Sequence, residues 1–272
     1  MTNTKQQVRE FYDEIGWQQE EGGLYQNARY DDLRPVVHDY IRDTRLRVNR
    51  GISPNGRFLL DAGSGPVQYD EYLTYSQGYQ KRVCFDISVQ ALREARKRIG
   101  DHGLFVVGDV ANLPFKQDAF DGIVSMHTIH HLPAGEHKRA YKELFRVLCP
   151  GKSAAIVNGW TNPALTGWLD NLIIFSRRLA RVLRGKPARA QQHDEKATFV
   201  QKTNARWLRR ELGAEMPIEI LSWRSASTRI LRTFIHEKFG GKSILRWLYT
   251  MEEKYPKFFG ENGQYPLVVM RK

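Results

Sequence analysis

The sequence RFLLDAGSGP, residues 57–66, gives the clearest indication of the fold class. A short apolar run leads into Asp61, and a Gly-x-Gly sequence follows at Gly63 and Gly65. An apolar run bounded by turn signals predicts a buried strand. The two glycines permit a tight turn and a close approach of the backbone to a ligand. We therefore predict a strand that ends in a ligand-binding loop.

The pattern repeats downstream. Four more apolar runs predict strands at 82–86, 104–109, 120–126 and 153–158. Helical periodicity over 88–99 follows Ser88, a plausible N-cap, and a second helical stretch over 135–151 is closed by Pro150 and Gly151. Apolar strands that alternate with helices indicate a parallel sheet with helices on both faces.

The later part of the chain predicts the remaining strands at 218–223 and 265–272, with about 40 helix-like residues between them. The expected fold class is α/β: a Rossmann-like, doubly wound, mainly parallel seven-stranded sheet with a helical N-terminal cap and helical insertions in the C-terminal half. The expected domains are the cap at 1–50, the nucleotide-binding core at 51–160, and the completion of the sheet with basic helical insertions at 161–272.

The predicted strand ends carry polar groups suited to a nucleoside. Ligands bind at the carboxyl ends of the strands in an open parallel sheet. Asp86 ends the second strand, where a carboxylate can accept hydrogen bonds from both ribose hydroxyls. Asp109 can accept an adenine amino hydrogen, and the backbone of Val110 can donate to a ring nitrogen. Gln68 stands where a dinucleotide fingerprint has its third glycine, which disfavours a dehydrogenase.

In order, the motifs DAGSGP, FDIS, GDVANLPF, FDGIVSMHTIHHL and LFRVLCPGKSAAIVN between Arg57 and Asn158 resemble the class I S-adenosylmethionine-dependent methyltransferases. The nearest subgroup is the small-molecule set that includes the ubiquinone and menaquinone C-methyltransferases. Lys152 and Pro66 depart from the usual glycines of this pattern. The resemblance implies S-adenosylmethionine as the cofactor, S-adenosylhomocysteine as the product, and no metal.

The resemblance also implies a set of cofactor-binding residues. The first loop surrounds the methionine portion, Asp86 holds the ribose, and Asp109 holds the adenine. Ser125, Met126 and His127 border the methyl group that is transferred. The expected cofactor residues are Asp61, Ala62, Gly63, Gly65, Asp86, Ile87, Asp109, Val110, Met126 and His127.

The histidines at 127, 130 and 131 allow three interpretations. Zinc would need further ligands in tetrahedral geometry, which two adjacent histidines and distant cysteines do not offer. A general base would serve oxygen methylation, and His130 and His131 are the candidate catalytic residues for it. The remaining interpretation is that these histidines pack at a helix entry.

The N-terminal aromatic residues are candidates for an acceptor-binding lid. Tyr12, Trp17 and Tyr25 are the expected substrate-contacting residues. Ordinary packing of a cap helix explains the same residues equally well.

The charge is concentrated in the second half of the chain. Residues 161–272 hold 21 Lys and Arg against 10 Asp and Glu, whereas the first 160 residues are almost neutral. The segment 165–184 predicts an amphipathic helix with arginines opposite its apolar face. Such a helix can lie on an anionic membrane surface. Packing of the apolar face on the core is the favoured alternative. The expected apolar face comprises Leu165, Trp168, Leu169, Leu172, Ile173, Leu179, Val182 and Leu183.

The two cysteines, Cys84 and Cys149, and a polar N-terminus predict a cytoplasmic protein, with a peripheral position at the inner membrane surface as an extension. The expected function is in-line methyl transfer to a small-molecule, lipid-linked or glycan-linked acceptor. The alternatives are an RNA methyltransferase that uses the basic half, and a catalytically silent cofactor-binding module. Nucleic acid is the less favoured partner because the sequence contains no RNA-binding module.

Overall fold

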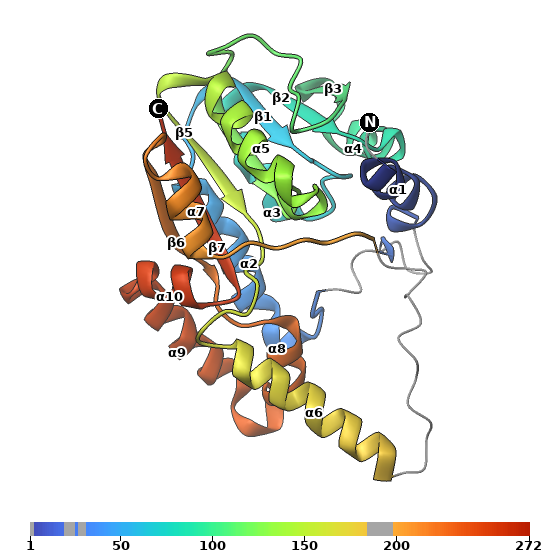
Figure 1. Ribbon diagram of the computed structural model, residues 1–272, viewed down its shortest axis with the longest axis vertical. Helices are drawn as coiled ribbons and strands as arrows, with labels where there is room; N and C mark the ends of the chain where they lie inside the picture. The colour runs from blue at the N-terminus through green and yellow to red at the C-terminus, as the bar shows by residue number, and fades with distance from the viewer. Residues whose placement is uncertain (1–2, 19–24, 27–30, 184–197) are drawn as a thin grey trace.

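The computed structural model describes residues 3–18, 25–26, 31–183 and 198–272. A seven-stranded sheet with the order β3-β2-β1-β4-β5-β7-β6 forms its centre (Figure 1). The strands are β1 (Gly56–Ala62), β2 (Tyr79–Asp86), β3 (Gly103–Val107), β4 (Phe120–Met126), β5 (Leu148–Val157), β6 (Ile218–Arg224) and β7 (Tyr265–Arg271). The first five strands pair in parallel, and β7 is antiparallel to both β5 and β6. This arrangement confirms the predicted Rossmann-like sheet.

Helices cover both faces of the sheet (Figure 1). Helices α5 and α7 pack on one face, whereas α4 and α10 lie on the other. The α-helices are α1 (Asn3–Phe11), α2 (His38–Leu46), α3 (Asp70–Leu73), α4 (Val89–Ile99), α5 (Ala134–Val147), α6 (Gly167–Leu183), α7 (Ala205–Leu212), α8 (Thr228–Phe234), α9 (Gly241–Lys254) and α10 (Pro256–Asn262).

The apolar runs in the sequence follow from this two-sided burial. Successive side chains of a strand point to opposite faces of the sheet. Leu60 and Ile123 therefore enter the core beneath α5, while Leu59 and Val124 enter the core on the opposite face. All four are fully buried, so the side chains on both faces of these strands contribute to the hydrophobic core.

The predicted ends of the third strand and of the helix at 135–151 were wrong. The third strand ends at Val107, so Asp109 lies in the following loop rather than in the strand. Helix α5 ends at Val147, and the expected stop signal, Pro150 and Gly151, lies inside β5. The register of β5 against β4 shifts over this stretch, which accommodates a proline that cannot donate to the ladder and a glycine with a φ of +75°.

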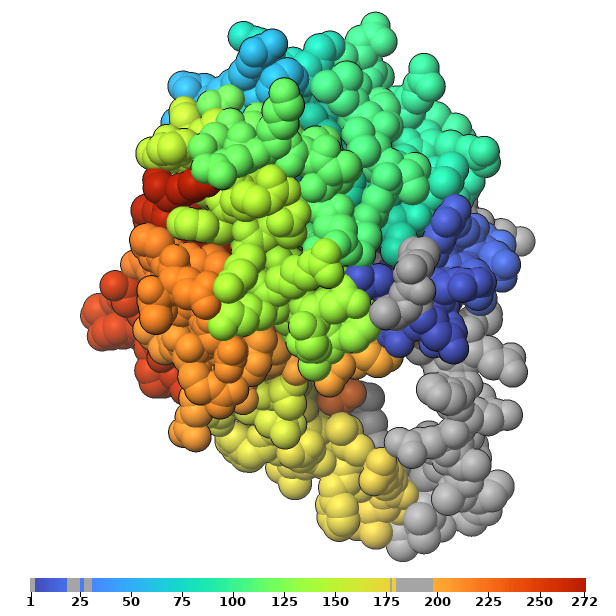
Figure 2. All heavy atoms as spheres, turned by 45° about the horizontal axis from the view of Figure 1, so that its top comes forward, coloured from blue at the N-terminus to red at the C-terminus, as the bar shows by residue number. Residues whose placement is uncertain are grey.

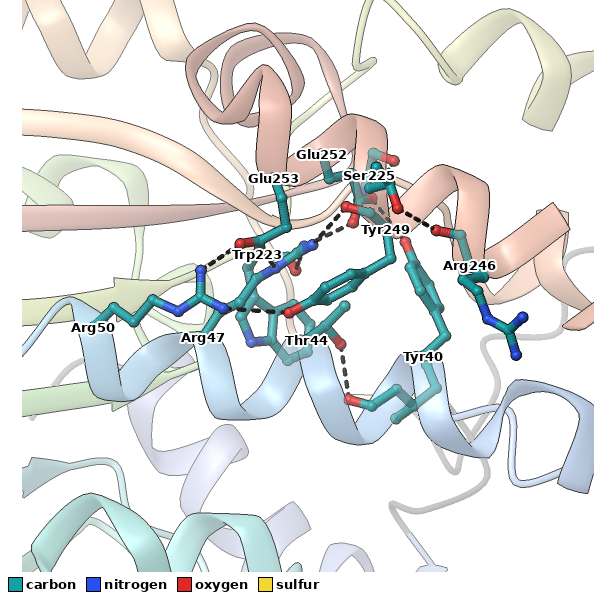
Figure 3. A network of polar contacts seen from close by, with 12 residues as sticks. Tyr40, Thr44, Arg47, Arg50, Trp223, Ser225, Arg246, Tyr249, Glu252 and Glu253 are labelled. Carbon is teal, nitrogen blue, oxygen red and sulfur yellow. Dashed lines mark hydrogen bonds and ion pairs between the residues drawn. The ribbon is translucent and has the colours of Figure 1, made fainter. Parts of the chain in front are cut away.

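A buried polar network joins the N-terminal helices to the insertion between β6 and β7 (Figure 3). Arg47 donates to Oε2 of Glu252 at 2.7 Å and to the carbonyl of Trp223 at 2.8 Å. The other oxygen of Glu252 accepts hydrogen bonds from the Tyr40 hydroxyl at 2.7 Å and from the backbone of Ser225 at 2.8 Å. The network therefore fixes the carboxyl end of β6 against α2 and α9.

The network predicts a large loss of stability when one charge is removed. The Glu252 side chain is fully buried, so Glu252→Gln leaves the Arg47 charge without compensation from that group. We expect the free energy of unfolding, measured in urea, to fall by about 3–5 kcal/mol. Glu237→Gln, at an exposed ion pair, is the control and should change it by less than about 0.5 kcal/mol. Equal effects of the two substitutions would contradict this account of the network.

Candidate functional site

A cavity of about 450 Å³ opens at the carboxyl ends of the strands. The expected cofactor residues line it, with the exception of Ala62. The side chain of Ala62 is buried, and its carbonyl accepts a hydrogen bond from Ser125. His130, His131, Tyr12 and Trp17 line the same cavity, whereas Tyr25 lies outside it and packs edge-on against Trp17.

The loop after β1 requires glycine at two positions. Gly63 and Gly65 have φ values of +75° and +54°. A Cβ atom at Gly63 would lie 2.1 Å from the side chain of Thr128, and one at Gly65 would lie 3.0 Å from the ring of Trp17. At Gly63 the contact with Thr128 leaves no room for a side chain, and at Gly65 the positive φ would strain another residue and the Trp17 ring would have to shift.

The carboxylate of Asp86 fixes this loop. Its Oδ2 accepts from the backbone of Gly65 at 2.9 Å, and its Oδ1 accepts from the backbone of Ser88 at 2.9 Å. Burial raises the pKa of Asp86 to about 6, although these two hydrogen bonds oppose the shift. Each oxygen keeps a lone pair, so the ionised carboxylate can still accept from a ribose diol.

Asp61 has a buried partner that the sequence analysis missed. Arg82 of β2 donates to Oδ2 of Asp61 from Nε at 3.0 Å and also from Nη2. Both side chains are almost completely buried. The available signal was a charged residue, Arg82, directly before the apolar run 83–85. Because Arg82 pairs with Asp61, this carboxylate does not stand free to attract a cationic group of a ligand.

The carboxylate of Asp109 is also bound by a residue of the protein. Lys5 of α1 donates to Oδ2 of Asp109 at 2.6 Å and forms a second ion pair with Glu136. Burial opposes ionisation of Asp109, but the hydrogen bonds from Lys5 and Ala111 lower its pKa below the usual range. Lys5 was not predicted as a site residue. It brings α1 to the end of the cavity where the adenine is expected.

The N-terminal segment covers the glycine loop. The rings of Tyr12 and Trp17 stack with their centroids 5.2 Å apart, and both line the cavity. Asp13 accepts a hydrogen bond from the Ser88 hydroxyl at 2.6 Å, which ties this segment to the start of α4. The segment therefore packs over this part of the cavity, which fits both interpretations of these aromatics, a lid and an ordinary cap helix.

The hydrogen bonds of the histidines distinguish between the two candidate bases. Nδ1 of His131 lies 2.7 Å from the carbonyl of Phe199 and must carry its proton, so Nε2 accepts from the Tyr12 hydroxyl at 2.9 Å. Nδ1 of His130 lies 3.2 Å from Oδ1 of Asn158, which assigns the proton to Nδ1. Nε2 of His130 then keeps a lone pair, whereas that of His131 is engaged.

All three histidines are held neutral. Burial lowers the pKa of His127 to about 3 and that of His131 to about 4. Burial and the two neighbouring histidines hold the pKa of His130 well below its ordinary value. The His127 ring packs edge-on against Trp223 and Tyr265, with ring centroids 5.2 Å and 5.5 Å away. No group of three potential metal ligands is present among the described residues.

Comparison with known proteins identifies the core. Residues 60–156 match the family model described as "Methyltransferase domain". The core is a class I S-adenosylmethionine-dependent methyltransferase domain. The chain is 24% identical over 187 residues to the demethylmenaquinone methyltransferase of Paenarthrobacter aurescens, covering 65% of this chain and 70% of that protein. The geranyl diphosphate C-methyltransferase of Streptomyces coelicolor shares the fold, with a TM-score of 0.57, 14% identity, and coverage of 99% and 98%.

Relatives that act on tRNA also match this domain. The chain is 34% identical over 176 residues to the probable tRNA methyltransferase 9B of Bos taurus, covering 60% of this chain and 36% of that protein. The chain spans only 23% to 36% of the length of the tRNA methyltransferases that it matches in a plant and two mammals.

The raised pKa of Asp86 predicts that S-adenosylhomocysteine binds more weakly in acid. Only the ionised carboxylate can accept from both ribose hydroxyls, so affinity should fall about tenfold between pH 7.5 and pH 5 if the pKa is about 6. Because this pKa is raised from 3.8 to about 6, the folded protein binds the proton more tightly than the unfolded chain, and the contribution of Asp86 to stability is lost as pH rises between these two values.

Calorimetric titration across this pH range measures the effect, with circular dichroism at each pH as the control for folding. Asp86→Asn should bind weakly and without this pH dependence. A wild-type affinity that stays constant from pH 7.5 to pH 5 would remove Asp86 from the ribose site.

Proposed function

We propose that the protein transfers the methyl group of S-adenosylmethionine to a small-molecule or lipid-linked acceptor. One observation carries the proposal: the glycine loop, Asp86 and the histidines line a single cavity. The cofactor residues would hold the donor there, and the acceptor would bind beside the histidines. The methyltransferase relatives support the chemistry, while their acceptors differ.

The cofactor supplies an activated methyl group on a sulfonium. The chain's own residues would position the acceptor in line with it, which alone provides much of the acceleration. For a hydroxyl acceptor, the oxygen–carbon bond forms as the carbon–sulfur bond breaks, and the hydroxyl proton passes to a base. His130 is the better candidate because its Nε2 is free, while Asn158 holds the ring through Nδ1.

A small acceptor is favoured over RNA because the N-terminal segment covers the reactive part of the cavity. Asn158 is buried, His130 is partly buried, and the Tyr12 hydroxyl hydrogen-bonds to His131 beside them. A polynucleotide would have to displace this cover to bring a base or ribose to His130. RNA binding through the basic half remains the alternative outcome of the test below, with phosphate contacts that weaken steeply with salt.

We also propose that α6 lies on an anionic membrane surface. Of the apolar residues expected to pack on the core, only Ile173 is buried among those whose side chains are described. Figure 2 shows α6 projecting from the body of the molecule. The exposed apolar residues Trp168, Leu172, Phe175 and Leu179 recur at intervals of three and four, so they form one stripe along the helix.

The positive charge of the C-terminal half favours an anionic membrane as the binding partner of this stripe. Residues 161–272 carry a net charge of +11, and Arg178 is exposed on α6 itself. An amphipathic helix binds such a surface through its apolar area together with electrostatic attraction. No helix among the described residues is long and apolar enough to span a membrane. Several of the arginines expected opposite the stripe lie outside the described side chains.

The first test is release of S-adenosylhomocysteine with a panel of hydroxylated lipids, quinols, sugars and transfer RNA. We expect turnover with a lipid or small hydroxylated compound. With that acceptor, His130→Gln should lower kcat by about 10²–10⁴-fold through loss of the base. His38→Gln, at an exposed histidine, is the matched control and should leave kcat unchanged. Turnover with transfer RNA alone would contradict the proposal.

The membrane proposal predicts sedimentation of the protein with vesicles that contain phosphatidylglycerol, and little with pure phosphatidylcholine. The double substitution Trp168→Ser and Phe175→Ser should weaken this partitioning at least tenfold, because it removes the largest exposed rings of the stripe. Phe258→Ser, at an exposed ring of α10, is the control. Equal partitioning of wild-type protein into both vesicle types would exclude electrostatic membrane binding.

A further inference from the structure

Arg224 is a buried cation whose donors are incompletely used. It is the last residue of β6, only 2% exposed, and it lines the cavity. Its Nε and Nη1 have no hydrogen-bond partner among the described residues. The carboxylate of Asp31 is 3.9 Å from Nη1, beyond hydrogen-bond distance. Buried polar groups are almost always hydrogen-bonded, so two unused donors of a guanidinium indicate a missing acceptor.

The chain holds Arg224 firmly in this position. On one side, Arg47 binds the carbonyl of Trp223, and on the other, Glu252 accepts from the backbone of Ser225 (Figure 3). The guanidinium carbon lies 5.1 Å from the ring centroid of Trp223 and 4.7 Å from that of Tyr265. The two donors therefore belong to a side chain whose backbone is fixed on both sides and whose head rests against aromatic rings.

The negative charge nearest to Arg224 is already engaged elsewhere. Asp31 accepts from Arg45 at 3.0 Å and from the Tyr69 hydroxyl at 2.5 Å. Burial opposes ionisation of Asp31, but Arg224 and Arg45 hold its pKa below the usual range. Arg45 also pairs with Glu71, so the local charges are balanced, but the hydrogen bonds of Asp31 go to Arg45 and Tyr69 and none reaches Arg224.

A second cation and an unused indole donor line the same cavity. Lys202 has no hydrogen bond or ion pair within the described ranges, and burial lowers its pKa. Nε1 of Trp223 is buried without a hydrogen-bond partner in the described structure. Together with Arg224, these residues give the cavity several hydrogen-bond donors and two cations whose hydrogen bonds are not satisfied by the described part of the protein.

We propose that Arg224, assisted by Lys202, binds an anionic group of the acceptor, either a carboxylate or a phosphate. A guanidinium presents a planar fork that matches both groups bidentately. The His127 ring packs against the same two aromatic rings as Arg224, which places the anion site beside the histidines. The acceptor would thus be anchored by its charge with its methyl-receiving atom toward His130.

The anion would also assist the base. An opposite charge nearby favours the charged form of a histidine, so a bound anion would raise the pKa of His130 toward the range in which it can accept a proton. The role of the anion as part of the acceptor rests on the proposed function. Binding of an anion at Arg224 does not.

The test is calorimetric titration of the protein, with and without S-adenosylhomocysteine, using inorganic phosphate and benzoate as probes at constant ionic strength. We expect one probe to bind, and the better one assigns the anchor as phosphate or carboxylate. Arg224→Met should weaken binding of that probe at least tenfold, and Arg224→Lys should weaken it less. Arg246→Met, at an exposed arginine of α9, is the matched control and should leave the affinity unchanged.

Two results would overturn the proposal: failure of wild-type protein to bind either probe, or wild-type affinity in Arg224→Met. If circular dichroism shows that Arg224→Met is unfolded, the test uses Arg224→Lys and Lys202→Met instead. Unchanged affinity in both of these variants would then overturn the proposal.

Binding of S-adenosylhomocysteine is measured separately. If that ligand binds and both anions fail, the anion site alone is wrong. If the anions bind and that ligand fails, the proposed function is wrong and the anion site stands.

Discussion

The direction of the strands is the constraint on which the site depends. Because β1 to β5 run parallel, the loops that follow them meet at one edge of the sheet. β7 runs antiparallel between β5 and β6, so β6 ends and β7 begins at that same edge. This topology brings Arg224 and Tyr265 to the cavity that the glycine loop and Asp86 begin. The proposed donor site thus draws mainly on the loops after β1, β2 and β3, and the proposed acceptor site on the segments that follow β4 and end β6.

Several arginines of this chain are buried, and their hydrogen-bond partners distinguish a structural role from a ligand-binding role. Arg82 is paired with Asp61, and Arg47 with Glu252, so each of these charges is compensated within the protein. Arg224 is equally buried, yet two of its donors are unused among the described residues. Burying a guanidinium whose donors lack hydrogen-bond acceptors is unfavourable. A ligand that supplies the missing acceptor explains why such a residue can stand there.

The sequence predicted the features that depend on local pattern. Apolar runs placed the strands, and the turn chemistry of Gly63 and Gly65 placed the loop that their positive φ values require. Helix α5 was extended too far because Pro150 and Gly151 act in a strand irregularity instead of a helix stop. The prediction that the apolar face of α6 packs on the core was wrong for Trp168 and Leu172, which are exposed. An amphipathic pattern identifies an apolar face but does not reveal what covers that face.

Lys5 and Arg224 were missed for a different reason. Lys5 contacts Asp109 across 104 positions of sequence, and Arg224 reaches the cavity only because β6 pairs beyond β7. No local pattern encodes either contact. The choice between His130 and His131 likewise depended on their distant partners, Asn158 and Phe199.

The proposed placement of the cofactor can be tested by a crystal structure of the protein with S-adenosylhomocysteine. We expect the ribose hydroxyls on Asp86 and the homocysteine against the loop at Gly63 and Gly65. The sulfur should face the part of the cavity lined by His130 and Arg224. A ligand bound elsewhere, or one whose sulfur points away from His130 and Arg224, would contradict this placement.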